Sequence, residues 1–140
     1  MTSRIYGIGN DIVKVSRLKS SFERHGDKFL KRAFHDDEIV VFKQIFNENN
    51  DRAFQFLGGR WAAKESIYKA LGNQERSKLN FQNIRIFNHT NGKPYVDLLD
   101  PTNQYFRELG IDTIHLAISH EDEYAISNVI LETTLDKLDK

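Results

Sequence analysis

No cysteine occurs among the 140 residues of the chain. This absence excludes a disulfide-stapled scaffold, a zinc site built from cysteine ligands and a cysteine nucleophile, and it fits a reducing compartment. No apolar run approaches the roughly 18 residues that a membrane-spanning helix needs. Residues 1–10 lack the hydrophobic segment of a secretory signal. We therefore expect no membrane partner.

The chain also lacks net charge, because 20 Lys and Arg side chains balance 20 Asp and Glu side chains. The balance is uneven along the sequence: residues 1–35 carry a net charge of +5, from eight basic and three acidic residues, whereas residues 100–140 carry −6, from three basic and nine acidic residues. The basic end predicts a docking surface for an acidic partner, unless the fold brings both ends together and cancels the field. Overall neutrality argues against nucleic acid as a partner.

The length suits one domain over 1–140. Helical spacing of apolar residues dominates the first half and strand pairs the second, which predicts an α+β fold with an antiparallel sheet packed against helices. We expect Ser16 and Asp36 to cap helices. Predicted strands are 5–13, 84–87, 94–99, 115–119 and 124–131, and 84–87 and 94–99 flank an Asn91-Gly92 hairpin turn. Predicted helices are 16–26, 29–34, one after Asp36, 53–71 and one between Pro101 and Gly110; 74–80 is a predicted loop and 132–140 a frayed tail.

The first motif that could carry chemistry is Gly-Ile-Gly-Asn-Asp at 7–11. Asp11 follows backbone that a ligand can approach closely, because glycine has no Cβ. Carboxylate oxygens are suitable hard ligands for Mg²⁺. The alternative is an ordinary loop aspartate. A dinucleotide-binding fingerprint fits poorly, because Ile12 stands where its third glycine is required.

The second motif is Arg-Trp-Ala-Ala-Lys-Glu-Ser-Ile-Tyr-Lys-Ala-Leu-Gly at 60–72, which predicts a helix. Glu65 and Lys69 lie one turn apart, so the carboxylate could take a metal and the ammonium a phosphate oxygen. The alternative is an ion pair on a solvated helix, worth about 0.2–0.5 kcal/mol. We expect Trp61 and Tyr68 in the core. At about 100° per residue, Ala63, Ile67, Ala70 and Leu71 form one apolar stripe, and Ala62 and Ser66 share the face of Glu65 and Lys69.

The third motif is His-Leu-Ala-Ile-Ser-His-Glu at 115–121. In a strand, His115, Ala117 and Ser119 share one face. Ser119 and His120 stand where the strand ends, and both can donate hydrogen bonds to phosphate or base atoms. The alternative is a turn-capping serine and a surface histidine.

In this order and spacing, the three motifs resemble those of the holo-acyl-carrier-protein synthase family, the small 4′-phosphopantetheinyl transferases. The run at 7–13 looks like the family's N-terminal signature, with Asn10 where threonine is more usual. Residues 59–72 resemble its central signature closely, and 118–125 resemble its third. The similarity extends from about residue 6 to residue 131.

Two departures from the family pattern bear on partner or coenzyme A contacts. Lys14 stands where an acidic residue is common, and Ala117 stands where serine is frequent. The resemblance nevertheless implies a 4′-phosphopantetheinyl transferase-like fold and a homotrimer with active sites between subunits.

The resemblance also implies a reaction in which coenzyme A donates its phosphopantetheine arm to a serine of apo acyl carrier protein, for fatty acid synthesis. The other product is adenosine 3′,5′-bisphosphate. A Mg²⁺ ion, or Mn²⁺, would be held by Asp11 and Glu65, because Mg²⁺ needs few protein carboxylates when phosphate oxygens and waters complete its shell.

By the same resemblance, the catalytic residues are Glu65 and Lys69, with Glu65 assisting loss of the serine proton. The basic residues Lys14, Arg17 and Arg24 would meet the carrier protein. The expected compartment is the bacterial cytoplasm or, with a presequence absent from this chain, the mitochondrial matrix. The residues expected to bind coenzyme A are Arg60, Lys64, Lys69, Ser119 and His120.

Two alternatives stay open. The first is a transferase that serves polyketide or peptide synthetase carriers, although such enzymes are usually about twice this length, with two such units in one chain. The second is a catalytically silent module that binds coenzyme A or the carrier. A complete set of Asp11, Glu65 and Lys69 argues against the silent module.

Overall fold

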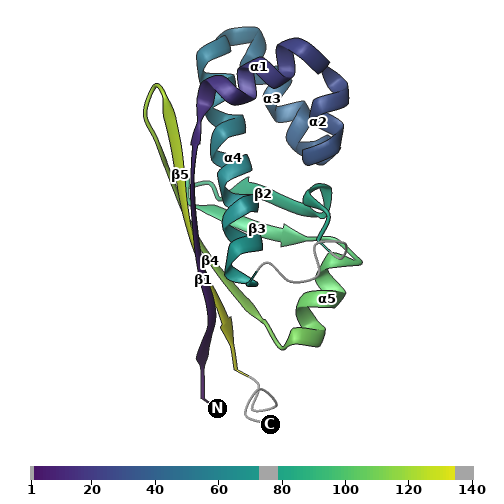
Figure 1. The fold of residues 1–140 in the computed structure, drawn as a ribbon, viewed down its shortest axis with the longest axis vertical. Helices are drawn as coiled ribbons and strands as arrows, with labels where there is room; N and C mark the ends of the chain where they lie inside the picture. Colours follow the sequence, from purple (N-terminus) through teal and green to yellow (C-terminus); the bar gives the residue numbers. More distant parts are fainter. Residues whose placement is uncertain (1, 73–78, 135–140) are drawn as a thin grey trace.

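A three-stranded antiparallel sheet and one long helix form the frame of the protein (Figure 1). The computed structural model describes residues 2–72 and 79–134. The sheet has the order β1 (Arg4–Lys14), β5 (Tyr124–Thr133), β4 (Thr113–His120). Helix α4 (Asn50–Ala70) packs along one face of this sheet. The predicted tail residues 135–140, and most of the predicted 74–80 loop, lie outside the described residues.

The remaining elements lie at one end of α4 and along one of its sides (Figure 1). Three helices gather at one end: α1 (Val15–His25), α2 (Asp27–Ala33) and α3 (Asp36–Glu48). On the side of α4 away from β1 lie η2 (Phe81–Asn83), the hairpin strands β2 (Ile84–Asn88) and β3 (Pro94–Leu98), and α5 (Thr102–Leu109). The α+β prediction with antiparallel sheets is confirmed.

Both predicted N-caps were wrong by one or two residues. Helix α1 begins at Val15, whose N–H donates to the Glu123 carbonyl at 2.8 Å, so the β4–β5 turn satisfies this helix start without a side-chain cap. Helix α3 is capped by His35, whose Nδ1 accepts from the Asp37 N–H at 3.1 Å. The His35 N–H donates in return to Glu38 at 3.0 Å, which completes a capping box.

The face of α4 that carries Glu65 and Lys69 differs from the prediction. The apolar stripe is buried as expected, but Ala62 and Ser66 are also fully buried. The Ser66 hydroxyl hydrogen-bonds to the hydroxyl of Ser127 on β5. These two small side chains therefore permit close packing of helix on sheet, and only Glu65 and Lys69 remain at its edge.

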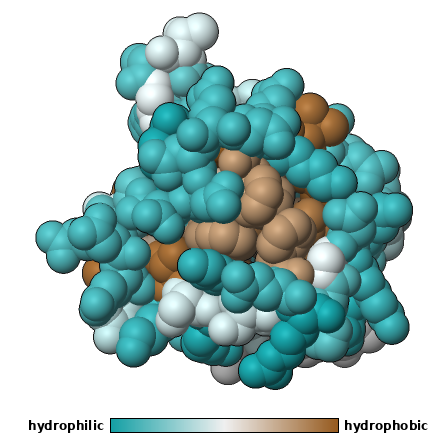
Figure 2. Space-filling model, turned by 90° about the horizontal axis from the view of Figure 1, so that it is seen from above, coloured by the Kyte–Doolittle hydropathy of each residue, from teal (hydrophilic) through white to brown (hydrophobic). Residues whose placement is uncertain are grey.

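Two apolar clusters fill the interior, one at each end of α4. The first lies among α1–α4 and contains four phenylalanines in mutual ring contact, with centroids 5.2–5.9 Å apart: Phe22, Phe42, Phe46 and Phe54. Figure 2, seen from this helical end, shows an apolar area framed by hydrophilic side chains. No helix in residues 2–72 and 79–134 combines the length and apolarity that crossing a membrane requires.

The contact between β1 and α4 depends on two glycines. A Cβ added to Gly7 would lie 1.9 Å from the Ala70 carbonyl oxygen, and one added to Gly9 would lie 2.0 Å from the Ser66 carbonyl oxygen. Both obstacles are helix backbone, which cannot rotate away as a side chain does. Strand and helix therefore approach each other more closely than any residue but glycine allows.

We predict that Gly9→Ala lowers the free energy of unfolding by about 3 kcal/mol, because the strand must move off the helix. Gly92→Ala is the matched control, since the added Cβ meets no atom within 4 Å and the only cost is the backbone strain of alanine at a φ of 88°. The control should cost about 1–2 kcal/mol. Urea unfolding at equal protein concentration measures both. A Gly9→Ala loss no larger than that of the control would contradict the close-contact interpretation.

Candidate active site

The meeting of β1 and α4 brings Asp11 and Lys69 together. Asp11 follows Gly7 and Gly9 at alternate positions, so all three face the helix. The Asp11 carboxylate is largely covered, with 14% of its side chain exposed, and its Oδ1 accepts from the Lys69 Nζ at 2.9 Å. Glu65 is half-buried one turn before Lys69 on the same helix face. Two carboxylates and one ammonium therefore lie on this edge of α4, which we call the β1-side group (Asp11, Glu65 and Lys69).

Arg60 lies on the opposite side of α4. Nine residues at about 100° each, or two and a half turns, place it on the face opposite to Lys69. Its Nη2 donates to the Asn88 Oδ1 of β2 at 3.2 Å, and its guanidinium carbon lies 4.3 Å from the centroid of the Phe56 ring. Sequence reasoning did not identify Asn88, because nothing local in the hairpin indicates that it meets a helix 28 residues earlier.

Burial leaves the Arg60 guanidinium incompletely paired. The residue is only 8% exposed, and among the described residues its buried Nε has no hydrogen-bond partner. Burial lowers the pKa of Arg60 to about 10, and the negative charge of Glu38 opposes this change. The side chain stays cationic at neutral pH. A buried cation with an orphan N–H is suited to an anionic ligand such as a phosphate.

Lys64 does not lie where the sequence analysis placed it. It was expected to bind coenzyme A, but the residue is 0% exposed. Its Nζ donates to the Glu38 Oε1 at 2.7 Å and to the Phe81 carbonyl at 2.8 Å. Burial lowers the pKa of Lys64 to about 8, against the opposing effect of the Glu38 charge. Because its ammonium is enclosed by protein partners, we withdraw Lys64 as a ligand residue.

Ser119 and His120 are exposed at the end of β4. Successive strand residues point to opposite faces, so Ser119 lies on the outer face, together with His115 and Ala117, as predicted. His120 pairs with Ala125 of β5, and β5 separates β4 from β1. Gly59 packs α4 directly onto Ile118 of β4, where an added Cβ would lie 2.9 Å from the Ile118 Cγ2.

The candidate residues therefore form two groups on either side of α4. The β1-side group contains Asp11, Glu65 and Lys69. The β4-side group contains Arg60, Asn88 and, at the end of β4, Ser119 and His120. One chain does not bring the two groups together, because α4 lies between them.

A second feature near the β4-side group is a cavity of about 400 Å³ between the β2–β3 hairpin and the outer face of β4 and β5. His89, Lys93 and His115 contribute basic or titratable groups to its wall. The rings of His89 and Tyr95 are stacked, with centroids 4.3 Å apart. The Asn91-Gly92 signal predicted the hairpin but not this wall.

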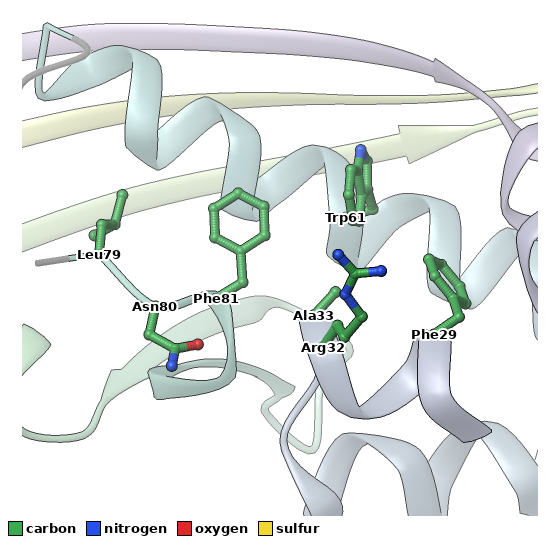
Figure 3. A pocket seen from close by; sticks show the side chains of 7 residues that line it. All are labelled: Phe29, Arg32, Ala33, Trp61, Leu79, Asn80 and Phe81. Atoms are coloured by element: carbon green, nitrogen blue, oxygen red, sulfur yellow. The ribbon is translucent and has the colours of Figure 1, made fainter. Parts of the chain in front are cut away.

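The predicted carrier-binding residues are solvent-exposed. Lys14 ends β1, and Arg17 and Arg24 project from α1. A separate cavity of about 610 Å³ lies between α2, α4 and η2. Figure 3 shows Arg32 projecting into the space between Phe29, Trp61 and Phe81. Trp61, which was expected in the core, packs against the helical apolar cluster, but it is only half-buried and also lines this cavity.

The described residues contain no group of three or more His, Cys, Asp or Glu side chains that could hold a metal ion on its own. Two carboxylates at the β1–α4 contact need further oxygens, from water or from a bound ligand, to complete the shell of such an ion. Phosphate oxygens are such ligands for Mg²⁺. The two carboxylates and the buried Arg60 cation are groups that suit a phosphate-bearing ligand.

Comparison with known proteins identifies the family. Residues 7–129 match the 4′-phosphopantetheinyl transferase superfamily, and the chain belongs to it. The chain is 38% identical over 128 residues to a holo-[acyl-carrier-protein] synthase of Anoxybacillus flavithermus, and the alignment covers 91% of this chain and 96% of the relative. It is 37% identical to the holo-[acyl-carrier-protein] synthase of Shewanella denitrificans, over 92% of this chain and 98% of that relative.

Solved structures agree with this assignment. The holo-[acyl-carrier-protein] synthase of Neisseria meningitidis superposes with a TM-score of 0.83 at 30% identity, over 91% of this chain and 98% of that one. A synthase of Bacillus anthracis, in complex with CoA (3′,5′-ADP), has a TM-score of 0.76 at 32% identity, over 93% and 98%. The expected family fold is confirmed.

Proposed function

We propose that the protein is a holo-[acyl-carrier-protein] synthase. It transfers 4′-phosphopantetheine from coenzyme A to a serine of apo acyl carrier protein. The serine oxygen bonds to the phosphorus that carries pantetheine, the bond from that phosphorus to the bridging pyrophosphate oxygen breaks, and adenosine 3′,5′-bisphosphate leaves. The observation that carries the proposal is the pairing of Asp11 with Lys69 beside Glu65. Family membership and relatives that bear this name support it.

The β1-side group fits a divalent cation. Asp11 already accepts a cationic partner, the Lys69 ammonium, and its carboxylate is mostly shielded from water. Asp11 and Glu65 would hold the Mg²⁺ or Mn²⁺ ion. When bound, the ion supplies charge neutralisation of the pyrophosphate. Lys69 would then be available to a phosphate oxygen, and Glu65 would accept the serine proton directly or through a water molecule.

The β4-side group suits the nucleotide end of coenzyme A. Arg60 offers a buried guanidinium with an orphan Nε, and Asn88 fixes one of its nitrogens. Ser119 and His120 add donors at the exposed end of β4. The adjoining cavity, with the stacked His89 and Tyr95 rings, offers room and an aromatic surface for a base.

We further propose a homotrimer whose active sites lie between subunits. The outer face of the sheet supports assembly, because four isoleucines on it are 38–66% exposed: Ile8, Ile12, Ile126 and Ile130. Exposed apolar faces of this kind mark protein interfaces. In a closed ring, the β1-side group of one chain could meet the β4-side group of the next.

The carrier protein would dock on the helical end. Arg17, Arg24 and Lys14 present positive charge, and the cavity beside Arg32 offers aromatic walls at Phe29 and Trp61. An acidic carrier with an apolar contact residue suits such a surface. We propose acyl carrier protein of fatty acid synthesis as the substrate and, because the relatives named above are bacterial, the bacterial cytoplasm as the compartment.

The transfer itself is directly testable. Incubation with apo acyl carrier protein, coenzyme A and Mg²⁺ should add the mass of the phosphopantetheine arm to the carrier, and a chelator should prevent it. Asp11→Asn and Glu65→Gln should each lower kcat at least about 100-fold, because each loses a charged metal ligand. Exposed Glu48→Gln is the control and should retain full rate. Binding of coenzyme A with no mass gain on any carrier would favour the silent module instead.

Carrier docking makes a separate prediction. Arg17→Ala with Arg24→Ala should raise the KM for the carrier about tenfold or more while leaving the KM for coenzyme A unchanged. Added salt should reduce the difference in carrier KM between this variant and the natural protein. Arg107→Ala on α5, at the other end of the molecule in Figure 1, is the control for loss of an arginine away from α1. Equal effects of both changes on the carrier KM would show that α1 is not the docking surface.

A further inference from the structure

Glu38 of α3 is a buried carboxylate that the proposed reaction does not use. It is 1% exposed, and its two oxygens have separate partners. Oε1 accepts from the Lys64 Nζ of α4 at 2.7 Å and from the His35 N–H at 3.0 Å. Oε2 accepts from the Ile86 N–H of β2 at 3.0 Å. One side chain thus joins a helix start, the central helix and the edge of the hairpin.

The hairpin needs such an attachment. β2 and β3 form a sheet of two strands, and an isolated two-stranded hairpin is marginally stable. The Ile86 N–H on the free edge of β2 is satisfied by the Glu38 carboxylate. A second link lies beside it, where the Arg85 Nη1 donates to Asp37 at 2.9 Å. The first turn of α3 therefore sets where β2 lies relative to α4.

These contacts close a ring that ends at the proposed nucleotide group. Asn88 follows Ile86 by two residues on β2 and accepts from Arg60. Arg60 precedes Lys64 by one helical turn on α4. From Lys64 the ring continues to Glu38, and from Glu38 to Ile86. A shift of β2 would therefore separate Asn88 from Arg60 without moving the β1-side group.

We propose that Glu38 is a positioning residue for coenzyme A: its bond to the Ile86 N–H holds Asn88 against Arg60, and thereby sets affinity for the nucleotide. The inference rests on the proposed function. A purely structural role for the Glu38–Lys64 pair would predict a different result. A buried ion pair can often be replaced by apolar side chains without loss of stability, so such a replacement would then leave coenzyme A binding unchanged.

Two double variants separate these roles. Glu38→Leu with Lys64→Met removes both buried charges and every acceptor for the Ile86 N–H. Glu38→Gln with Lys64→Met also removes both charges but keeps one acceptor oxygen. The two proteins differ at a single side chain of similar size. If Glu38 acts through Ile86, only the Leu variant should lose coenzyme A affinity.

We expect the Leu variant to raise the KM for coenzyme A and the dissociation constant of adenosine 3′,5′-bisphosphate about tenfold, as one lost hydrogen bond permits. The Gln variant should stay within about threefold of the natural protein, and the KM for the carrier should not change in either. Equal coenzyme A constants in the two variants would overturn the proposal. Absence of transfer by the natural protein would instead overturn the proposed function.

If the Leu variant does not fold, Asp37→Ala tests the same attachment from the surface, because 56% of the Asp37 side chain is exposed. Losing the acceptor for the Arg85 Nη1 should raise the KM for coenzyme A about threefold with the carrier KM unchanged. An unchanged coenzyme A KM in the folded Asp37→Ala protein would also overturn the proposal.

Discussion

The close approach of β1 to α4 is the contact on which the candidate site depends, because it determines where the first aspartate of the chain can reach. Gly7 and Gly9 press their backbone against the carbonyls of Ala70 and Ser66. Asp11, two residues further along the same strand face, is thereby carried to Lys69. A side chain at either glycine would displace the strand, so backbone sterics rather than attraction between charges bring residues 11 and 69 together.

Helix α4 consequently separates the β1-side group from the β4-side group as well as supporting the sheet. Its β1 side presents Glu65 and Lys69, whereas its other side presents Arg60 toward Asn88. The Glu38–Lys64 pair stabilises this arrangement from within, and breaking it by removing one partner would cost about 3–5 kcal/mol. In the proposed reaction, the β1-side group would meet the pyrophosphate of coenzyme A and the β4-side group its nucleotide end. Their separation within one chain explains physically why a site completed by a neighbouring subunit is attractive.

Much of the fold was predictable because helix and strand periodicities are local: the Asn91-Gly92 hairpin, the apolar stripe of α4 and the exposed face of His115, Ala117 and Ser119 all follow from spacing. The candidate site was less predictable from the sequence. Nothing in the sequence around Lys64 distinguishes it from an exposed lysine, and its burial depends on a carboxylate 26 residues earlier. Ala62 and Ser66 serve helix–sheet packing, which no single-helix pattern reveals. Asp11 and Glu65 were selected by family resemblance, since the residues alone favoured an ordinary loop aspartate at Asp11 and a solvated ion pair at Glu65.

The central claim, that one active site combines the β1-side group of one chain with the β4-side group of another, is tested most directly by mixing two inactive proteins. Asp11→Asn lacks the first group and Arg60→Met lacks the second. Refolded together in equal amounts, they should regain about a quarter of the natural transfer rate, because half the chains supply an intact first group and half their neighbours an intact second group. A mixture as inactive as its separate components would place the whole site within a single chain and contradict the account.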